Sequence, residues 1–211
     1  MFHTTSLQFS YSGQRQFSYP AIALQQRGEP LLITGPSGSG KTTLLHLLAG
    51  LLRPTEGSVF VQQTDITRLP DRQLDRFRGR HIGLVFQRPH FVESISVGRN
   101  ILLPTLWSRP DTDAALRLQQ LADRLAIGHL LAARPTRLSQ GELQRAAIAR
   151  ALINQPGLVL ADEPTSALDD ANCQAAIGLL QQQCQLAGAQ LLVVTHDSRL
   201  TQAFTQRIHL A

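Results

Sequence analysis

The apolar positions of this chain follow two periods, one typical of strands and one typical of helices. Short apolar or alternating runs predict strands at residues 5–10, 16–24, 31–34, 57–62, 81–86, 158–161 and 191–195. Longer stretches with helical spacing predict helices at residues 41–51, 71–78, 97–103, 112–126, 129–133, 139–153 and 170–186. Several of these strands are apolar throughout and alternate with helices, which indicates a mostly parallel sheet covered on both faces.

A glycine-rich turn, GPSGSGKTT at residues 35–43, lies between the strand at 31–34 and the helix that follows. It matches the phosphate-loop pattern G-x-x-x-x-G-K-[ST], in the context of strand, turn and helix that the pattern requires. Glycines let successive N–H groups point toward one anion, and the helix N-terminus adds unpaired N–H groups. We therefore expect Lys41 to reach the β- and γ-phosphates of a nucleotide and Thr42 to place its hydroxyl on Mg²⁺.

Lys41 is also the only lysine in the chain, because every other positively charged side chain is an arginine. A compact ammonium fits among phosphate oxygens better than a planar guanidinium does. Taken together, the patterns predict an α/β fold with a P-loop NTPase core, as a single domain over residues 1–211. From Pro89 to about Arg137 the pattern becomes helical.

Polar side chains follow the predicted strands at their carboxyl ends, where parallel sheets bind ligands. Asp162 and Glu163 come directly after four apolar residues; beside a phosphate loop, the first would hold Mg²⁺ and the second would accept a proton from attacking water. Without that loop they would be two solvated acids. His196 follows the last strand, where a γ-phosphate contact and a structural role both remain open. Gln87 ends another strand and by itself indicates nothing more.

The segment Leu138–Glu142 opens a predicted helix with the sequence LSQGE. Ser139 and Glu142 have the spacing of a capping box, which explains helix initiation with no further function. The alternative is a second anion site, formed by Ser139 and nearby amides at the helix N-terminus. The residues alone leave both interpretations open.

Composition restricts the class of protein further. The chain has 211 residues, 43% hydrophobic and 17% charged, with a net charge of +5 and a pI of about 10.2. These values are typical of a globular domain. No apolar span approaches the roughly 20 residues of a membrane helix, and the N-terminus shows no secretory signal, so we expect a cytosolic protein. The cysteines, Cys173 and Cys184, lie about 16 Å apart along one predicted helix, too far for a disulfide. The arginines between 68 and 80 fit a solvated helix face better than a polyanion site.

A set of motifs in fixed order now becomes informative: GPSGSGKT, Gln87 in VFQ, LSQGE, LVLADEP, SALD at 166–169 and THD at 195–197. In this order they resemble the ATP-binding subunit of an ABC transporter over nearly the whole chain. Within that family the chain is most similar to small bacterial subunits of the lipoprotein-release and macrolide-exporter type.

The resemblance implies roles for the matching positions. Glu163 would be the general base, His196 a γ-phosphate contact, and Gln87 a Mg²⁺ ligand that senses the γ-phosphate. Tyr11 would stack on adenine, although Phe9 or Phe17 would also serve. The phosphate-binding positions would be Gly35, Pro36, Ser37, Gly38, Ser39, Gly40, Lys41, Thr42 and Thr43. Mg²⁺ would be held by Thr42, Gln87 and Asp162. The residues at the dimer seam would be Ser139, Gly141 and Asp169, the first two on ATP bound to the other subunit.

The implied protein is an ATPase with ATP and Mg²⁺ as its cofactors, at the inner face of the cell membrane. The resemblance also implies an antiparallel β subdomain at the N-terminus and a helical subdomain, at about residues 89–152, inserted in the core. Its partners would be a transmembrane transporter subunit and a second ATP-binding subunit, most simply an identical chain, with no nucleic acid. Two departures from the family pattern matter: Gln140 replaces the usual glycine, and Glu142 replaces the common glutamine. A Cβ at position 140 narrows the approach to a phosphate across the dimer, so we expect lower ATPase activity than with glycine there.

Two other classes remain as alternatives. A soluble ABC-type ATPase of DNA repair or translation usually carries a coiled-coil insertion or a second nucleotide domain, and this chain shows neither. A small-molecule phosphotransferase would share the phosphate loop, but the LSQGE helix and His196 argue against it. The transported substrate and the direction of transport do not follow from these residues.

Overall fold

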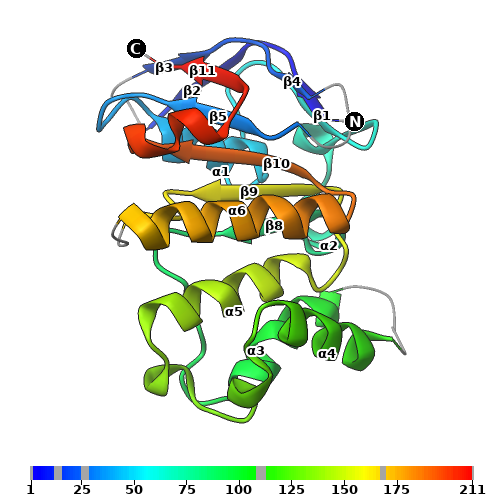
Figure 1. Cartoon of the computed structure of the whole chain (residues 1–211). Helices are drawn as coiled ribbons and strands as arrows, with labels where there is room; N and C mark the ends of the chain where they lie inside the picture. Colours follow the sequence, from blue (N-terminus) through cyan, green and yellow to red (C-terminus); the bar gives the residue numbers. More distant parts are fainter. Residues whose placement is uncertain (1, 12–15, 25–28, 108–112, 167–169, 211) are drawn as a thin grey trace.

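The computed structural model describes residues 2–11, 16–24, 29–107, 113–166 and 170–210. A parallel sheet lies at the centre of the fold. Its strand order is β11-β5-β10-β9-β8, and every neighbouring pair is parallel (Figure 1). The strands are β5 (Leu31–Thr34), β8 (Ile82–Val85), β9 (Leu158–Asp162), β10 (Gln190–Thr195) and β11 (Gln206–His209). Thr195 pairs with Thr34 and Val194 with Asp162, so the carboxyl ends of β5, β9 and β10 meet at one edge.

The residues of each central strand alternate between two hydrophobic cores, one on each face of the sheet. Leu158 and Leu160 of β9 pack into the core that contains α1 (Lys41–Leu48). Val159 and Ala161 pack into the other core, with α5 (Gln140–Leu152) and α6 (Asp170–Leu186). Because both faces are covered, the strands are apolar throughout, as the sequence pattern indicates. The helices α1 and α5 therefore lie on opposite faces of the sheet (Figure 1).

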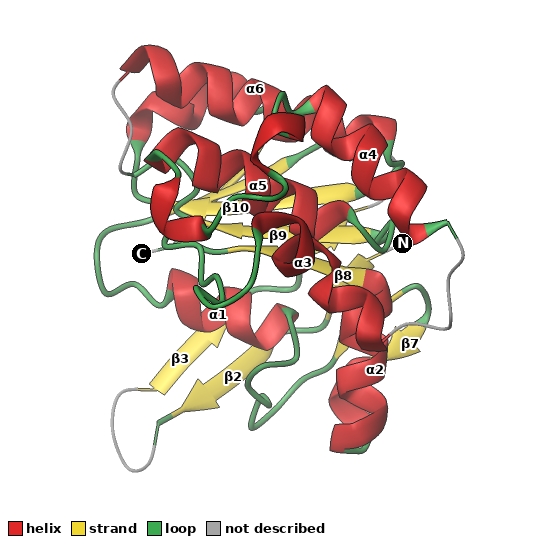
Figure 2. Ribbon diagram, turned by 90° about the horizontal axis from the view of Figure 1, so that it is seen from below, coloured by secondary structure: helices red, strands yellow, loops and turns green. Residues whose placement is uncertain are grey.

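Short antiparallel strands from the N-terminal part cover the α1 side of the sheet (Figure 2). One sheet has the order β4-β1-β6-β7, and β2 and β3 form a separate hairpin. The strands are β1 (Phe2–Thr4), β2 (Leu7–Ser10), β3 (Gln16–Tyr19), β4 (Ala23–Leu24), β6 (Val59–Val61) and β7 (Thr64–Asp65). The predicted strand 16–24 is thus divided between two sheets. Pro20, which has no N–H to donate to a ladder, follows directly after β3.

The helices α3 (Val97–Leu102) and α4 (Ala114–Arg124) lie below α5 in Figure 1. The helix α2 (Asp71–His81) lies beside β8, and its Leu74 packs into the core that contains α1. The 3₁₀ turns are η1 (Ile66–Arg68), η2 (Leu103–Trp107), η3 (Gly128–Leu130), η4 (Pro135–Arg137) and η5 (Ser198–Ala203). Within the described ranges, none of the helices has the length and apolar character needed to cross a bilayer.

The predicted α/β fold class is confirmed, with local corrections. The helix expected at 129–133 is only the 3₁₀ turn η3. Strand β11 was not predicted, because its sequence QRIH is polar and mostly exposed; it is an edge strand paired on one side with β5. Both cysteines are buried and free, and burial raises the pKa of the Cys184 thiol to about 12, as expected for an idle thiol.

Candidate functional site

The phosphate loop connects β5 to α1 at the edge where the strand ends meet. Gly38 and Gly40 have φ values of 81° and 91°, which side chains disfavour. A Cβ on Gly40 would lie 2.5 Å from the Tyr19 hydroxyl, and a Cβ on Gly35 would lie 2.6 Å from the Leu210 carbonyl oxygen. Glycine is therefore required at both positions 35 and 40 by the surrounding atoms, independently of any ligand.

Lys41 is almost fully buried and points back into the loop. Its ammonium donates hydrogen bonds to the carbonyl oxygens of Gly35, at 2.8 Å, and Pro36, at 2.9 Å. The Ser39 hydroxyl is buried and has no hydrogen-bond partner among the described residues. Of the side chains that the structure describes, none caps the N-terminus of α1. A cation, an unsatisfied hydroxyl and free helix N–H groups thus converge at one point, which is the chemistry of an anion site.

Thr42 and Asp162 face each other across the sheet edge. The Thr42 hydroxyl donates to Oδ1 of Asp162 at 3.3 Å, joining the first turn of α1 to the end of β9. Burial raises the pKa of the Asp162 carboxyl above its usual range, and the hydrogen bond from Thr42 only partly opposes this rise. Two oxygen donors beside an anion site suit a hard divalent cation such as Mg²⁺.

Glu163 is held against the end of β10 by several hydrogen bonds. Its Oε2 accepts from the Thr195 hydroxyl at 2.6 Å. Its Oε1 lies 2.6 Å from Nδ1 of His196 and accepts from the His196 N–H at 2.9 Å. Glu163 has a φ of 46°, a conformation uncommon for a residue with a side chain. The three residues form one cluster, although they come from the ends of two different strands.

Gln87 follows β8, and its amide donates to the Ser166 hydroxyl at 3.1 Å. Ser166 lies in the segment that follows Glu163, so Gln87 is linked to the loop after the acid pair rather than to Thr42 or Asp162. The sequence did not indicate the contact with Ser166, which appears only in the fold.

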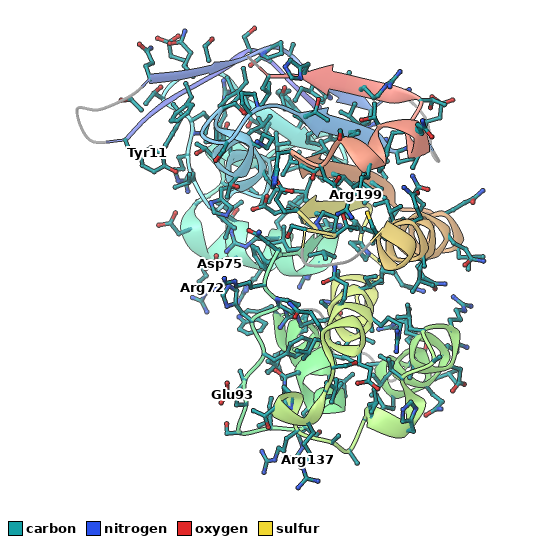
Figure 3. All side chains as sticks on the ribbon, turned by 60° about the vertical axis from the view of Figure 1, so that its left-hand side comes forward. Tyr11, Arg72, Asp75, Glu93, Arg137 and Arg199 are labelled. Atoms are coloured by element: carbon teal, nitrogen blue, oxygen red, sulfur yellow. The ribbon has the colours of Figure 1, made fainter. Side chains whose placement is uncertain are left out.

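Tyr11 lies over the start of α1, at the outer edge of the antiparallel strands (Figure 3). Its hydroxyl is 3.2 Å from the Thr43 hydroxyl, and its ring packs edge-on against Phe9 and Phe17. The residue is 45% exposed, which leaves room for a planar ligand. Phe17 is placed differently, because its ring packs directly on Gly40.

Ser139 begins α5, and both halves of the predicted capping box form. The Ser139 hydroxyl and N–H donate to Glu142 at 2.7 and 2.8 Å, and the Ser139 oxygen accepts from the Glu142 N–H at 3.4 Å. The bond from the Ser139 hydroxyl, followed by that from its N–H, lowers the pKa of the Glu142 carboxyl. Among the described residues, a Cβ on Gly141 would meet only the end of Arg145, so packing against them does not require glycine there. Asp169 lies outside the described residues.

The arginines between 68 and 80 include two ion pairs. Arg68 pairs with Asp65, and Arg78 pairs with Asp75 while also donating to the Gly50 carbonyl oxygen. These contacts are those of a charged helix face that neutralises part of its own charge.

Comparison with known proteins settles which family this arrangement represents. The family model described as "ABC transporter" matches residues 24–166. The chain belongs to the ABC transporter family. Among curated proteins it is 37% identical to the lipoprotein-releasing system ATP-binding protein LolD of Shewanella denitrificans over 185 residues, covering 87% of this chain and 79% of that protein.

Further similarities extend over the whole length of this ABC protein. It is 40% identical over 211 residues to the uncharacterized ABC transporter ATP-binding protein YvcR of Bacillus subtilis, covering 97% of this chain and 81% of that one. Its fold is similar to the dimeric post-hydrolysis state of the ATP-binding cassette MJ0796 bound to ADP and Pi, with a TM-score of 0.85 and 31% identity. That alignment covers 100% of this chain and 94% of MJ0796.

The chain is therefore an ATP-binding cassette, an ATPase that energises an ABC transporter. The family expected from the ordered motifs is confirmed, and the likeness to lipoprotein-release subunits is confirmed as a similarity to LolD. Sequence reasoning missed Thr195, which entered only as the first letter of THD. The available signal was a hydroxyl residue that ends an apolar strand directly before the histidine.

Proposed function

We propose that two copies of this ABC cassette bind two Mg·ATP molecules between them and that hydrolysis drives a transmembrane partner. The observation that carries the proposal is the separation of two anion-binding features within one chain. The phosphate loop opens α1 on one face of the parallel sheet, whereas Ser139 opens α5 on the other. A second copy would bring its own Ser139 end to the ATP held by the loop of the first.

The side chains at the sheet edge suit the nucleotide. Lys41 would exchange its two loop carbonyl oxygens for phosphate oxygens, and the Ser39 hydroxyl would gain a partner. Pro36, Ser37, Gly38, Thr43 and the other loop residues would surround the phosphates, with Tyr11 against the adenine. In the same proposal, Thr42, Asp162 and Gln87 would hold Mg²⁺, which supplies positive charge to the phosphate oxygens.

Hydrolysis would follow from the Glu163 cluster. Water adds to the γ-phosphorus, the bond to the ADP oxygen breaks, and the Glu163 carboxylate accepts the proton of the water. His196, whose side chain is 59% exposed, would turn from Glu163 toward the γ-phosphate. Ser139 and Gly141 of the second copy would contact the same phosphate, and Asp169 would lie at the seam.

The transmembrane partner would bind the helical part of the chain, which we treat as a subdomain over about residues 89–152 inserted in a single domain. A hollow of about 530 Å³ lies where this part meets α2 and β8, and it is lined in part by Arg78, Phe86, Trp107 and Arg150. Trp107 beside it is 52% exposed and Leu106 is 73% exposed. Exposed apolar side chains next to arginines are typical of a surface that binds another protein. A transmembrane partner bound here would keep the cassette at the inner face of the membrane.

The test is Glu163→Gln, which keeps the shape of the side chain and removes its basicity. We expect turnover to fall by about 100-fold or more, because a general base contributes on that scale. The variant should accumulate as an ATP-bound dimer in light scattering. Glu93→Gln makes the same chemical change on an exposed loop. Figure 3 shows Glu93 far from Tyr11, which we place against the adenine, so this variant should hydrolyse ATP as wild type does. A Glu163→Gln protein that stays monomeric in saturating Mg·ATP would refute the paired-copy mechanism.

A further inference from the structure

The hydroxyl of Thr195 is fixed between two partners inside the protein. It accepts a hydrogen bond from the Asp197 N–H at 2.9 Å and donates one to Oε2 of Glu163 at 2.6 Å. Thr195 itself is fully buried. A hydroxyl has a single proton, and an ionised carboxylate only accepts, so the direction of both bonds is determined. Bonds in such a chain polarise and strengthen one another.

The backbone around Thr195 leaves this hydroxyl little freedom. Thr195 is the last residue of β10, which is paired with β5 on one side and β9 on the other. The next segment is anchored as well, because the Asp197 carboxylate accepts from the Arg199 N–H and pairs with its guanidinium. The Thr195 hydroxyl, which donates to Glu163, is therefore held between the paired end of β10 and the anchored segment that follows it.

His196, in contrast, holds Glu163 with a side chain that is 59% exposed. It contacts Oε1, whereas Thr195 contacts Oε2. If the imidazole turns to the γ-phosphate, Oε1 keeps the bond from the His196 backbone N–H but loses the imidazole, so one side of this oxygen becomes available to water. Oε2 keeps the Thr195 hydroxyl throughout. Glu163 also needs outside support, because its φ of 46° is sparsely populated by residues with a Cβ.

We propose that Thr195 is a positioning residue for hydrolysis, which anchors one oxygen of Glu163 so that the other faces the attacking water. This inference rests on the proposed role of Glu163 as general base. Thr195 touches neither nucleotide nor water in this proposal and acts only through the carboxylate. Its loss should therefore change the rate of hydrolysis and leave nucleotide binding intact.

The experiment compares Thr195→Val with Thr195→Ser in steady-state ATP hydrolysis. Valine keeps the shape and removes the hydroxyl; we expect kcat to fall by about tenfold or more, because small misplacements of a reacting group are costly. KM for Mg·ATP should stay within about twofold. Serine retains the hydroxyl and should restore kcat to within about threefold. If valine leaves kcat unchanged, or if serine is as impaired as valine, the proposal is wrong.

A matched control separates positioning from general loss of stability. Thr4 is also buried, and its hydroxyl accepts from the Ile22 N–H at 3.0 Å, but no catalytic carboxylate is near it in the bonds described. Thr4→Val should lower the melting temperature and leave kcat as in wild type. If Thr4→Val and Thr195→Val reduce kcat equally, the effect is structural and the positioning role is refuted.

A double variant distinguishes failure of this inference from failure of the proposed function. In the Glu163→Gln background, Thr195→Val should have no further effect on the residual single-turnover rate, because the group on which it acts is gone. An equal loss in both backgrounds would refute the inference. If Glu163→Gln alone remains fully active, the proposed base is wrong, whatever Thr195 does.

Discussion

The hydroxyl of Thr42 donates a 3.3 Å hydrogen bond to Asp162, and this contact joins the phosphate loop to the acid pair. The two side chains are 120 positions apart in the chain. They meet because β9 lies next to β10, and β10 next to β5, with their carboxyl ends at one edge. Because of this contact, the edge of the sheet offers a candidate Mg²⁺ site in addition to the phosphate loop.

Replacing Asp162 tests the metal site. Asp162→Asn should weaken the response of ATP hydrolysis to Mg²⁺ by about tenfold or more, since a charged oxygen ligand is lost. A titration of kcat with Mg²⁺ at saturating ATP measures this. The control is Asp123→Asn, on α4 and outside the site. Identical Mg²⁺ curves for wild type and Asp162→Asn would exclude Asp162 as a ligand.

The same variant should stabilise the metal-free protein at neutral pH. Burial raises the pKa of Asp162 in the folded state, so the folded protein holds its proton to higher pH than the unfolded chain. Stability therefore falls as pH rises from the unfolded value of about 3.8 through the folded value, and stays lower above it. The neutral amide of the Asp162→Asn variant avoids this cost and still accepts from Thr42. Melting temperatures in a chelator should favour the variant at neutral pH, by an amount that vanishes in acid; a variant less stable than wild type at neutral pH would contradict the argument.

Variants of Gln140 test whether its side chain hinders the approach of α5 to the phosphate across the proposed dimer. Gln140→Gly should raise ATPase activity by about threefold, which corresponds to about 0.7 kcal/mol of barrier. Gln140→Ala keeps the Cβ and removes only the amide. If the Cβ is the obstacle, alanine should behave like glutamine. Equal rates for glycine and glutamine would count against the expected effect of this residue.

Glu142 tests the capping box through pH. The bonds from Ser139 lower the folded-state pKa of Glu142 below its ordinary value of 4.5. Its carboxylate therefore stabilises the folded chain above about that pH, and the contribution is lost as pH falls through the folded value. Glu142→Ala should lower the melting temperature at neutral pH and have a diminishing effect in acid. Glu142→Gln retains an acceptor for Ser139, so its melting temperature should lie between those of wild type and Glu142→Ala. A melting-temperature difference that is independent of pH would show that the charge is unimportant.

Variants of Tyr11 test whether its ring stacks on adenine. Tyr11→Ala should raise KM for ATP by about tenfold, because stacking on an aromatic ring contributes about 1–3 kcal/mol. Tyr11→Phe keeps the ring, loses only the contact with Thr43, and should bind ATP as wild type does. If alanine has no effect on KM, the stacking ring is another one, and Phe17→Ala is the variant to measure next.

Local patterns along the chain were sufficient for most of the fold and much of the site. The phosphate loop was predictable because its glycines, Lys41 and Thr42 are contiguous and flanked by a strand and a helix. The strands at 31–34, 158–161 and 191–195 were predictable because both their faces are buried, which makes them apolar throughout. The helix at 170–186 was predicted at its observed bounds.

The remaining features depend on contacts between distant segments, which no local pattern contains. Strand β11 is polar because a single edge pairing with β5 leaves its side chains exposed. The bond from Thr195 to Glu163 depends on two strands being neighbours with matched ends, and the sequence separation of 32 residues hides this. Residues next to each other in the chain thus determined the glycine-rich loop at residues 35–43. The positions of Asp162, Glu163 and Thr195 around it required the folding of distant segments into one sheet.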